Sequence, residues 1–278
     1  MSVYWRFVGV GALPWQSLDI LFALPVFALV LFRLAGLMMT APLLSSSSMP
    51  IRVRIGFVVG CAVVIFPLVS VHAPARLELV DVVVGGVREL TIGACMGLAV
   101  ATMMSGVEIG GLMIGQQAGI ALGQVFNPVQ DRQTSIVGQI YSMVLVLIFL
   151  SVGGHRAMLS ALLDSFEVIP MWSSVRSAPP ALLIAEMLAS SLILAVRLAG
   201  PVLAAVFMAS IAMGFLSRTM PQLNILSVGF QARILIGMGA AAIALLSARD
   251  LFLGAIWDGI AMIRDHYGLD AVGRMAGA

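Results

Sequence analysis

Long apolar runs, interrupted only by single charged residues, constrain this chain more than any other feature of its sequence. Apolar residues make up 61% of the chain and charged residues only 10%, whereas a soluble protein carries about 25% charged residues. A soluble fold of this size could neither bury so much apolar surface nor cover it with so few charges. Lipid, or other equally apolar chains, must therefore surround the protein. This composition excludes a cytosolic enzyme, a nucleic-acid-binding protein and a disordered scaffold.

The pattern inside these runs predicts helices. The runs cover residues 20–44, 55–71, 90–107, 133–154, 182–216 and 234–248, and none alternates apolar and polar residues with a period of two. Because a membrane-spanning segment must satisfy its backbone polar groups internally, this pattern favours helices over a barrel. The sequence therefore predicts an all-α, polytopic, membrane-inserted protein.

The breaks between the runs predict one domain over residues 1–278. The most linker-like piece is 170–180, which is rich in Pro and Ser and weakly divides a longer first part from a C-terminal helical hairpin. We expect Glu108 to close the run 90–107 and Gly153 to end the run 133–154. We also expect Glu186, Arg197 and Pro201 to break the run 182–216.

Five charged residues stand where lipid is expected: Arg33, Arg88, Glu89, Glu108 and Arg197. A charge at the bilayer centre costs about 2.5–3.5 kcal/mol, so these side chains need partners. Arg88 and Glu89 are adjacent and cannot pair with each other within one helix. One interpretation is a proton or ion relay, and the other is pairing across subunit contacts. We favour pairing, because a relay needs acidic residues converging from several helices and these runs hold few.

A ladder of glycines with a four-residue spacing follows the third run. It comprises Gly111, Gly115, Gly119 and Gly123, preceded by Gly106 and Gly110. Such a stripe lets another backbone approach closely, yet each interior glycine weakens the helix by about 1 kcal/mol. The ladder is therefore either a tight helix-packing face or a movable plug in a conduit, and it does not decide between the two. Asn127 and Pro128 end this piece.

Motifs of enzymes are absent from the sequence. It contains no HExxH zinc motif, no phosphate-binding loop and no lysine for a Schiff base. Cys61 and Cys95 have no CxxC spacing, and the three histidines are scattered, so we expect no redox site, no metal site and no cofactor. The chain is predicted to be a non-enzyme.

Three groups of residues resemble a known family. The first runs from Phe32 to Gly36 and continues to Pro42 and Pro50, and the second is the glycine-rich segment that ends at Asn127-Pro128. The third is the most specific: Gly214 to Arg218, Pro221 to Asn224, then Gly229-Phe230. In order and spacing, over about residues 18–250, these resemble the flagellar biosynthetic protein FliR family of type III secretion export gates, which has injectisome homologues. Pro42, Pro50, Asn127, Pro128, Arg218 and Pro221 are the positions that we expect to matter structurally in this match.

This resemblance implies a function. The chain would be a structural and gating subunit that forms, with FliP- and FliQ-type subunits and beside an FlhB-type switch protein, the gate through which unfolded flagellar subunits cross. It would lie in membrane lipid of the bacterial inner membrane, at the flagellar basal body, and would bind no nucleic acid. In the assembled gate, kinked helical hairpins would wind into a closed helical assembly that lies largely above the bilayer plane, and the five charges would pair there with neighbouring subunits.

The resemblance also implies a pore plug between Gly110 and Gln124. The residues expected in it are Gly110, Gly111, Met113, Gly115, Gln116, Gln117, Gly119, Gly123 and Gln124. Two other functions compete with this one. A secondary transporter or small-solute permease is less favoured, because the sequence shows no convincing internal repeat. An assembly factor without pore contact is the third hypothesis. The Pro221–Asn224 stretch favours a flagellum over a virulence injectisome.

Overall fold

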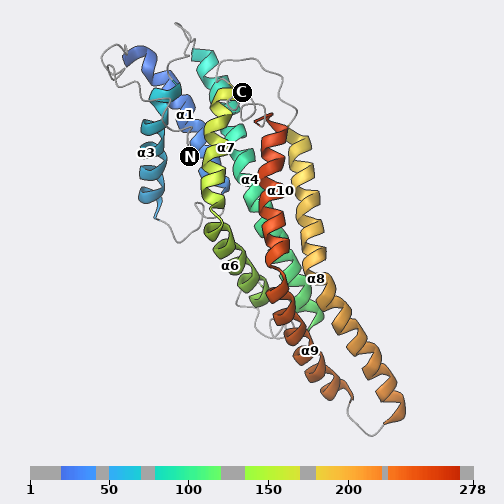
Figure 1. The fold of residues 1–278 in the computed structure, drawn as a ribbon. Coiled ribbons are helices and arrows are strands. Elements are labelled where there is room, and N and C mark those ends of the chain that lie inside the picture. The colour runs from blue at the N-terminus through green and yellow to red at the C-terminus, as the bar shows by residue number, and fades with distance from the viewer. Residues whose placement is uncertain are drawn as a thin grey trace.

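The computed structural model describes residues 20–41, 50–69, 79–119, 135–169, 180–220 and 225–269. Within these ranges the chain is helical and contains no strand, which confirms the predicted all-α class (Figure 1). The helices are α1 (Ile20–Thr40), α3 (Ile51–Val69), α4 (Leu79–Gln117), α6 (Ile136–Ser151), α7 (Gly154–Val168), α8 (Pro180–Thr219), α9 (Ile225–Ser247) and α10 (Arg249–His266).

Several helices are long and apolar enough to cross a bilayer. Val82–Gln117, Pro180–Thr219 and Val228–Ser247 qualify alone, and α6 and α7 together qualify as a pair bent by 64°. This result confirms a polytopic membrane protein. The bend lies at Gly153, whose φ of 78° is in the left-handed region that glycine adopts readily. The predicted end of the run 133–154 is therefore confirmed, although a second helix, α7, continues beyond it.

The central element is α4, which contacts most of the other helices. Its N-terminal half packs against α1, and its C-terminal half packs against α6 and α8. The expectation that Glu108 ends a helix is wrong, because α4 runs unbroken over 39 residues from Leu79 to Gln117. Glu108 is exposed on the helix surface, so its charge does not require the backbone to leave helical geometry.

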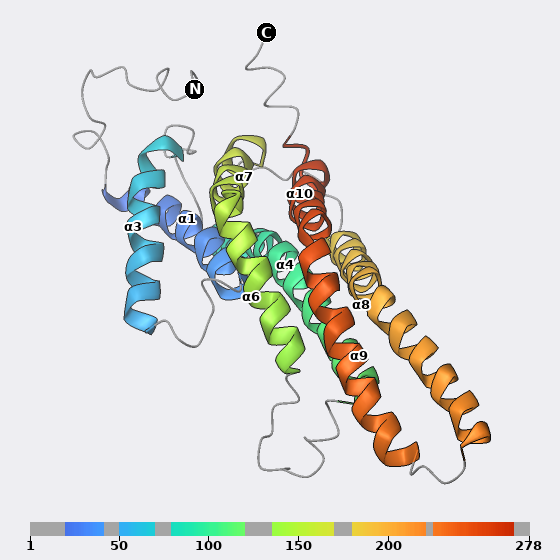
Figure 2. The same ribbon diagram turned by 60° about the horizontal axis from the view of Figure 1, so that its bottom comes forward.

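From residue 180 onward, the described residues form three helices, and not the predicted pair. α8 is continuous over 40 residues and passes through Glu186, Arg197 and Pro201, so none of these residues breaks it. α9 returns along the C-terminal half of α8, and the two form a hairpin that projects past the end of α4 (Figure 2). α10 then continues towards the opposite end, packed on α4, α8, α6 and α7. α10 contains no long apolar run, because charged residues are spread along it.

Much of the apolar surface is not covered within this chain. On α3, large side chains such as Ile51, Ile55 and Val64 are exposed, and no atom of the described residues lies within 4 Å of a Cβ placed on Gly56 or Gly60. On the α8–α9 hairpin, Phe215 and Leu246 are 71% and 84% exposed. These faces need lipid or another protein chain, since monomeric soluble proteins rarely expose such large patches.

Candidate functional site

A row of glycines on α4 lets its neighbours approach to backbone contact. We call Gly93, Gly97, Gly106, Gly110, Gly111 and Gly115 the glycine seam. A Cβ on Gly93 would collide with the Arg33 carbonyl of α1, and one on Gly97 would collide with Thr40. Backbone therefore packs directly on backbone here, as small residues allow in membrane helices. The Thr40 hydroxyl adds a hydrogen bond to the Ala94 carbonyl across this contact, at 3.0 Å.

The seam continues into the predicted ladder with different partners. A Cβ on Gly106 would lie 2.5 Å from the Ser191 carbonyl oxygen of α8, and one on Gly110 would lie 3.0 Å from that of Ala195. A Cβ on Gly111 would lie 2.3 Å from the Cα of Gly138 on α6, so position 111 has no room for a larger residue. Between Gly106 and Gly115, the ladder is thus a tight helix-packing face.

This packing corrects part of the predicted plug. Gly110, Gly111, Met113 and Gly115 lie inside the α4 helix and not in a loop, and the three glycines are buried against other helices. Gln116 and Gln117 end α4 and are exposed, while Gly119 follows with a φ of 80° and faces the Phe230 ring of α9. Gly123 and Gln124 lie outside the described residues, so their part of the plug stays a prediction.

A buried ion pair joins α1 to α4. The Arg33 guanidinium Nε donates a hydrogen bond to Oε2 of Glu89, and neither side chain is exposed. The prediction that these two charges pair with a neighbouring subunit is therefore wrong, because each has its partner in the same chain. The opposite charges of Arg33 and Glu89 were the available sequence signal, but they do not show which helices are neighbours.

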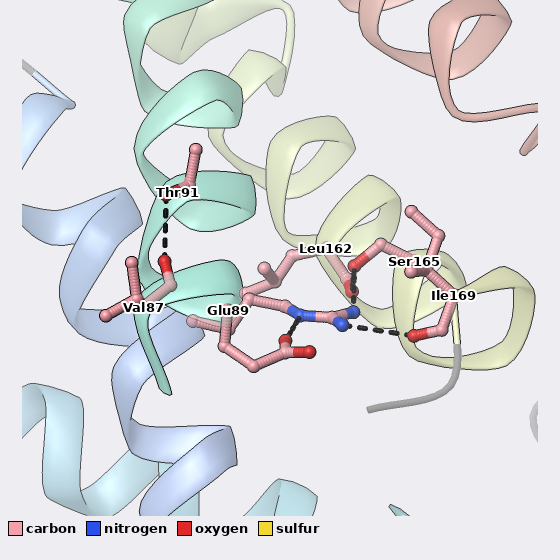
Figure 3. A network of polar contacts seen from close by, with 7 residues as sticks. Val87, Glu89, Thr91, Leu162, Ser165 and Ile169 are labelled. Atoms are coloured by element: carbon pink, nitrogen blue, oxygen red, sulfur yellow. Dashed lines mark hydrogen bonds and ion pairs between the residues drawn. The ribbon is translucent and has the colours of Figure 1, made fainter. Parts of the chain in front are cut away.

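The remaining donors of Arg33 hold α7 (Figure 3). Nη1 donates to the Ser165 hydroxyl and Nη2 donates to the Ile169 carbonyl, both at 3.0 Å. The guanidinium also lies 4.2 Å from the centre of the Phe166 ring, a cation–π distance. Ile169 is the C-cap of α7, and the last turn of that helix has no basic residue of its own. Arg33 thus supplies the positive charge that a helix C-terminus favours.

We call Arg33, Glu89, Ser165, Phe166 and Ile169 the Arg33 junction. A cation in a low-dielectric interior is stable only when its charge and its donors are matched, as they are here. Glu89 Oε1 is buried with no hydrogen-bond partner in the described parts of the chain, so the carboxylate depends on Arg33. Tyr267, directly after α10, lies near both Arg33 and Cys95, and burial raises the pKa of its phenol, which keeps it neutral.

The other three predicted charges have different surroundings. Glu108 is exposed, and its Oε1 accepts a hydrogen bond of 3.5 Å from the Ser142 hydroxyl of α6. Arg197 is exposed on α8, and the described residues give it no ion-pair partner. Arg88 is half-buried on α4 and takes part in a polar or electrostatic interaction. Pairing of these three with other subunits stays a prediction.

The predicted family-motif positions are only partly described. Pro50 immediately precedes α3 and is exposed, and its carbonyl accepts a hydrogen bond of 3.0 Å from the Val53 amide. Arg218 is exposed in the last turn of α8. Pro42, Asn127, Pro128 and Pro221 lie outside the described residues. Within the described ranges, no group of three or more His, Cys, Asp or Glu could hold a metal ion.

Comparison with known proteins decides the family. A sequence model of the Bacterial export proteins, family 1, matches residues 24–258. The chain belongs to this family. The matched residues include both partners of the Arg33–Glu89 ion pair and the whole glycine seam. It also confirms the resemblance to the FliR family, as the relatives below show.

The relatives include flagellar biosynthetic proteins and a Yop proteins translocation protein. The flagellar biosynthetic protein FliR of Bacillus subtilis (strain 168) is 33% identical over 219 residues, which are 76% of this chain and 82% of the Bacillus protein. FliR of Escherichia coli (strain K12) is 27% identical over 214 residues, or 76% of this chain and 81% of the relative. The Yop proteins translocation protein T of Yersinia pestis is 26% identical over 202 residues, or 72% and 77%.

Proposed function

We propose that this chain is a structural and gating subunit of the flagellar type III export channel, assembled with FliP-, FliQ- and FlhB-type proteins in the bacterial inner membrane. Family membership makes the chain a component of a type III export apparatus. The flagellar branch is supported by the higher identity to FliR of Bacillus subtilis, 33%, than to the Yop translocation protein, 26%. We propose that the chain catalyses no reaction and acts as a structural part of the export channel.

One observation carries the assembly part of this proposal. α8 has 40 residues and is therefore about 60 Å long, twice the roughly 30 Å of the bilayer's hydrocarbon core. Large apolar side chains are exposed along nearly its whole length, from Leu182 and Leu192 to Phe207 and Phe215. Lipid can cover only about half of such a stripe, so other protein chains are needed for the rest.

The Arg33 junction and the glycine seam support a scaffold role. Backbone contacts and a buried ion pair tie α1, α4 and α7 into one unit, while the α8–α9 hairpin extends beyond it. A permease is not favoured, because the relatives belong to protein-export systems. We infer that the rigid unit anchors the chain and that the hairpin reaches neighbouring subunits.

The assembly part is tested by site-specific photo-crosslinking. A photoreactive residue replaces Leu192 or Phe215, and the full chain is expressed in its own host during flagellar assembly. We expect protein adducts with FliP- or FliQ-type subunits from at least one of the two positions. Adducts with lipid alone from both positions would refute the proposal that other subunits cover α8.

The gating part is tested by a short deletion after α4. Because Gly111 and Gly115 hold helices together, a deletion across them would confound packing with gating. Removal of residues 120–124 leaves the described seam intact and removes Gly123 and Gln124. We expect membranes to leak small ions during export, while Gly56→Ala, on the open face of α3, serves as a control without leakage. Unchanged permeability and unchanged export would remove the plug from the proposal.

A further inference from the structure

A groove between α6, α9 and α10 has the composition of a lipid site. Its volume is about 610 Å³, and six of its nine lining residues are apolar aliphatic. The other three are Ser151, Arg249 and Trp257. The Ser151 hydroxyl already donates to the Ile148 carbonyl at 2.8 Å. Arg249 and Trp257 therefore supply the free polar donors of the lining.

The groove lies where two apolar helices end at the same level. α6 contains no charged residue and ends at Ser151, and the candidate span in α9 ends at Ser247. The helices that follow are charged: α7 begins with His155 and Arg156, and α10 begins with Arg249 and Asp250. Charged residues thus become more frequent at this level on two neighbouring helices, and Arg233 is the single charge of α9 before it.

The charge in the groove has one sign. Arg249 is exposed, and within the described ranges neither a hydrogen bond nor an ion pair joins its side chain to another residue. No carboxylate is among the groove residues. A guanidinium recognises phosphate through several N–H donors at once. Trp257, 48% exposed at the rim, has the amphipathic ring that collects at headgroup level.

The lining combines apolar side chains with one cation that has no ion-pair partner among the described residues, which matches the acyl chain and the phosphate of an anionic phospholipid. We propose that this groove binds an anionic phospholipid, with its phosphate on Arg249 and one acyl chain along the apolar side chains of α6 and α9. The site requires only that the chain is embedded in a membrane, so it is independent of the partners in the export channel.

Tryptophan fluorescence provides the test. Trp5→Phe, Trp15→Phe and Trp172→Phe together leave Trp257 as the only tryptophan of the full chain. This protein is placed in phosphatidylcholine nanodiscs in which a minor fraction of the lipid is phosphatidylglycerol with brominated acyl chains, which quench a neighbouring indole. We expect phosphatidylglycerol to be enriched about fivefold at Trp257 over its bulk fraction, as one arginine near an anionic headgroup provides.

A matched pair of variants separates the groove from general surface charge. Arg249→Gln should reduce quenching by brominated phosphatidylglycerol to that of brominated phosphatidylcholine at the same fraction. Arg156→Gln removes an exposed arginine at the same level that does not line the groove, and it should leave the enrichment unchanged. Circular dichroism checks that both variants keep the helical content of the parent.

Three results would overturn the proposal. Equal quenching by the two brominated lipids in the parent would mean ordinary boundary lipid. Equal loss of enrichment in both arginine variants would mean general attraction to a charged surface. No quenching by either lipid would mean that the groove faces protein or water.

Discussion

The Arg33 guanidinium of α1 and the Glu89 carboxylate of α4 form an ion pair in which neither side chain is exposed to solvent. The two residues are 56 positions apart in the chain. The same guanidinium donates a hydrogen bond to the Ile169 carbonyl and so caps the C-terminal end of α7. One side chain thereby fixes the relative positions of three helices, so its environment offers the sharpest tests of the fold.

Removing one partner of this ion pair should lower the stability of the fold far more than removing both. Arg33→Met or Glu89→Leu leaves an uncompensated buried charge, and each is expected to lower stability by about 3–5 kcal/mol. The double variant replaces both charges by apolar groups and should recover a large part of that loss. The measurement is a double-mutant cycle on unfolding in detergent. Additive losses would contradict the pairing seen here.

A surface ion pair provides the contrast. Arg264 Nη1 of α10 lies 3.1 Å from Asp164 Oδ2 of α7, with both side chains 27–30% exposed. Asp164→Asn should therefore change stability by less than about 1 kcal/mol, and the effect should shrink with added salt. Unfolding curves at low and high salt check this expectation. A loss as large as that of Glu89→Leu would mean that burial does not set the strength of these pairs.

Glycines of the seam should not tolerate even one methyl group. Gly93→Ala places a Cβ against the Arg33 carbonyl, so α1 and α4 must separate and stability should fall. Gly56→Ala meets open space on α3 and should be neutral or stabilising by up to about 1 kcal/mol, because alanine favours the helix. Thermal unfolding of the two variants gives the comparison. A Gly93→Ala variant as stable as the parent would show that α1 and α4 are not in backbone contact.

The Ser165 hydroxyl should contribute to stability because it accepts a hydrogen bond from the buried Arg33 guanidinium. Ser165→Ala removes an acceptor for a buried cation, so a loss of about 1.5–3 kcal/mol is expected. Ser160→Ala, on the exposed side of the same helix, should have an effect within about 0.5 kcal/mol. In the background of Arg33→Met, Ser165→Ala should cause little further loss of stability. If Ser165→Ala instead weakened α7 in general, its effect would be the same in both backgrounds.

The sequence predicts the helical class and the close-packing glycines because both depend on local composition. Gly93 and Gly97 share the spacing that lets helices approach, and the structure places them against α1. Helix continuity was not predictable in the same way. Arg197 and Pro201 suggested breaks, yet α8 passes through both, because packing along α4 outweighs the local preference of single residues.

The partners of the charged residues depend on tertiary structure. Nothing in the spacing of Arg33 and Glu89 says that their helices lie side by side, so pairing with another subunit was the natural expectation. α10 was missed because Asp250, Asp258 and Arg264 interrupt its apolar positions. The ladder glycines left packing and gating open, and only neighbours such as Gly138 and Ser191 show that Gly106 to Gly115 form a packing face.

Purification of the assembled complex tests the central claim most directly. The full chain carries an affinity tag, is expressed in its own host and is extracted in mild detergent, and the mass and composition of the purified particle are measured. We predict a stable particle that contains FliP- and FliQ-type subunits in contact with α8 and α9. A monodisperse chain without these subunits, still supporting flagellar protein export in the same cells, would contradict the account.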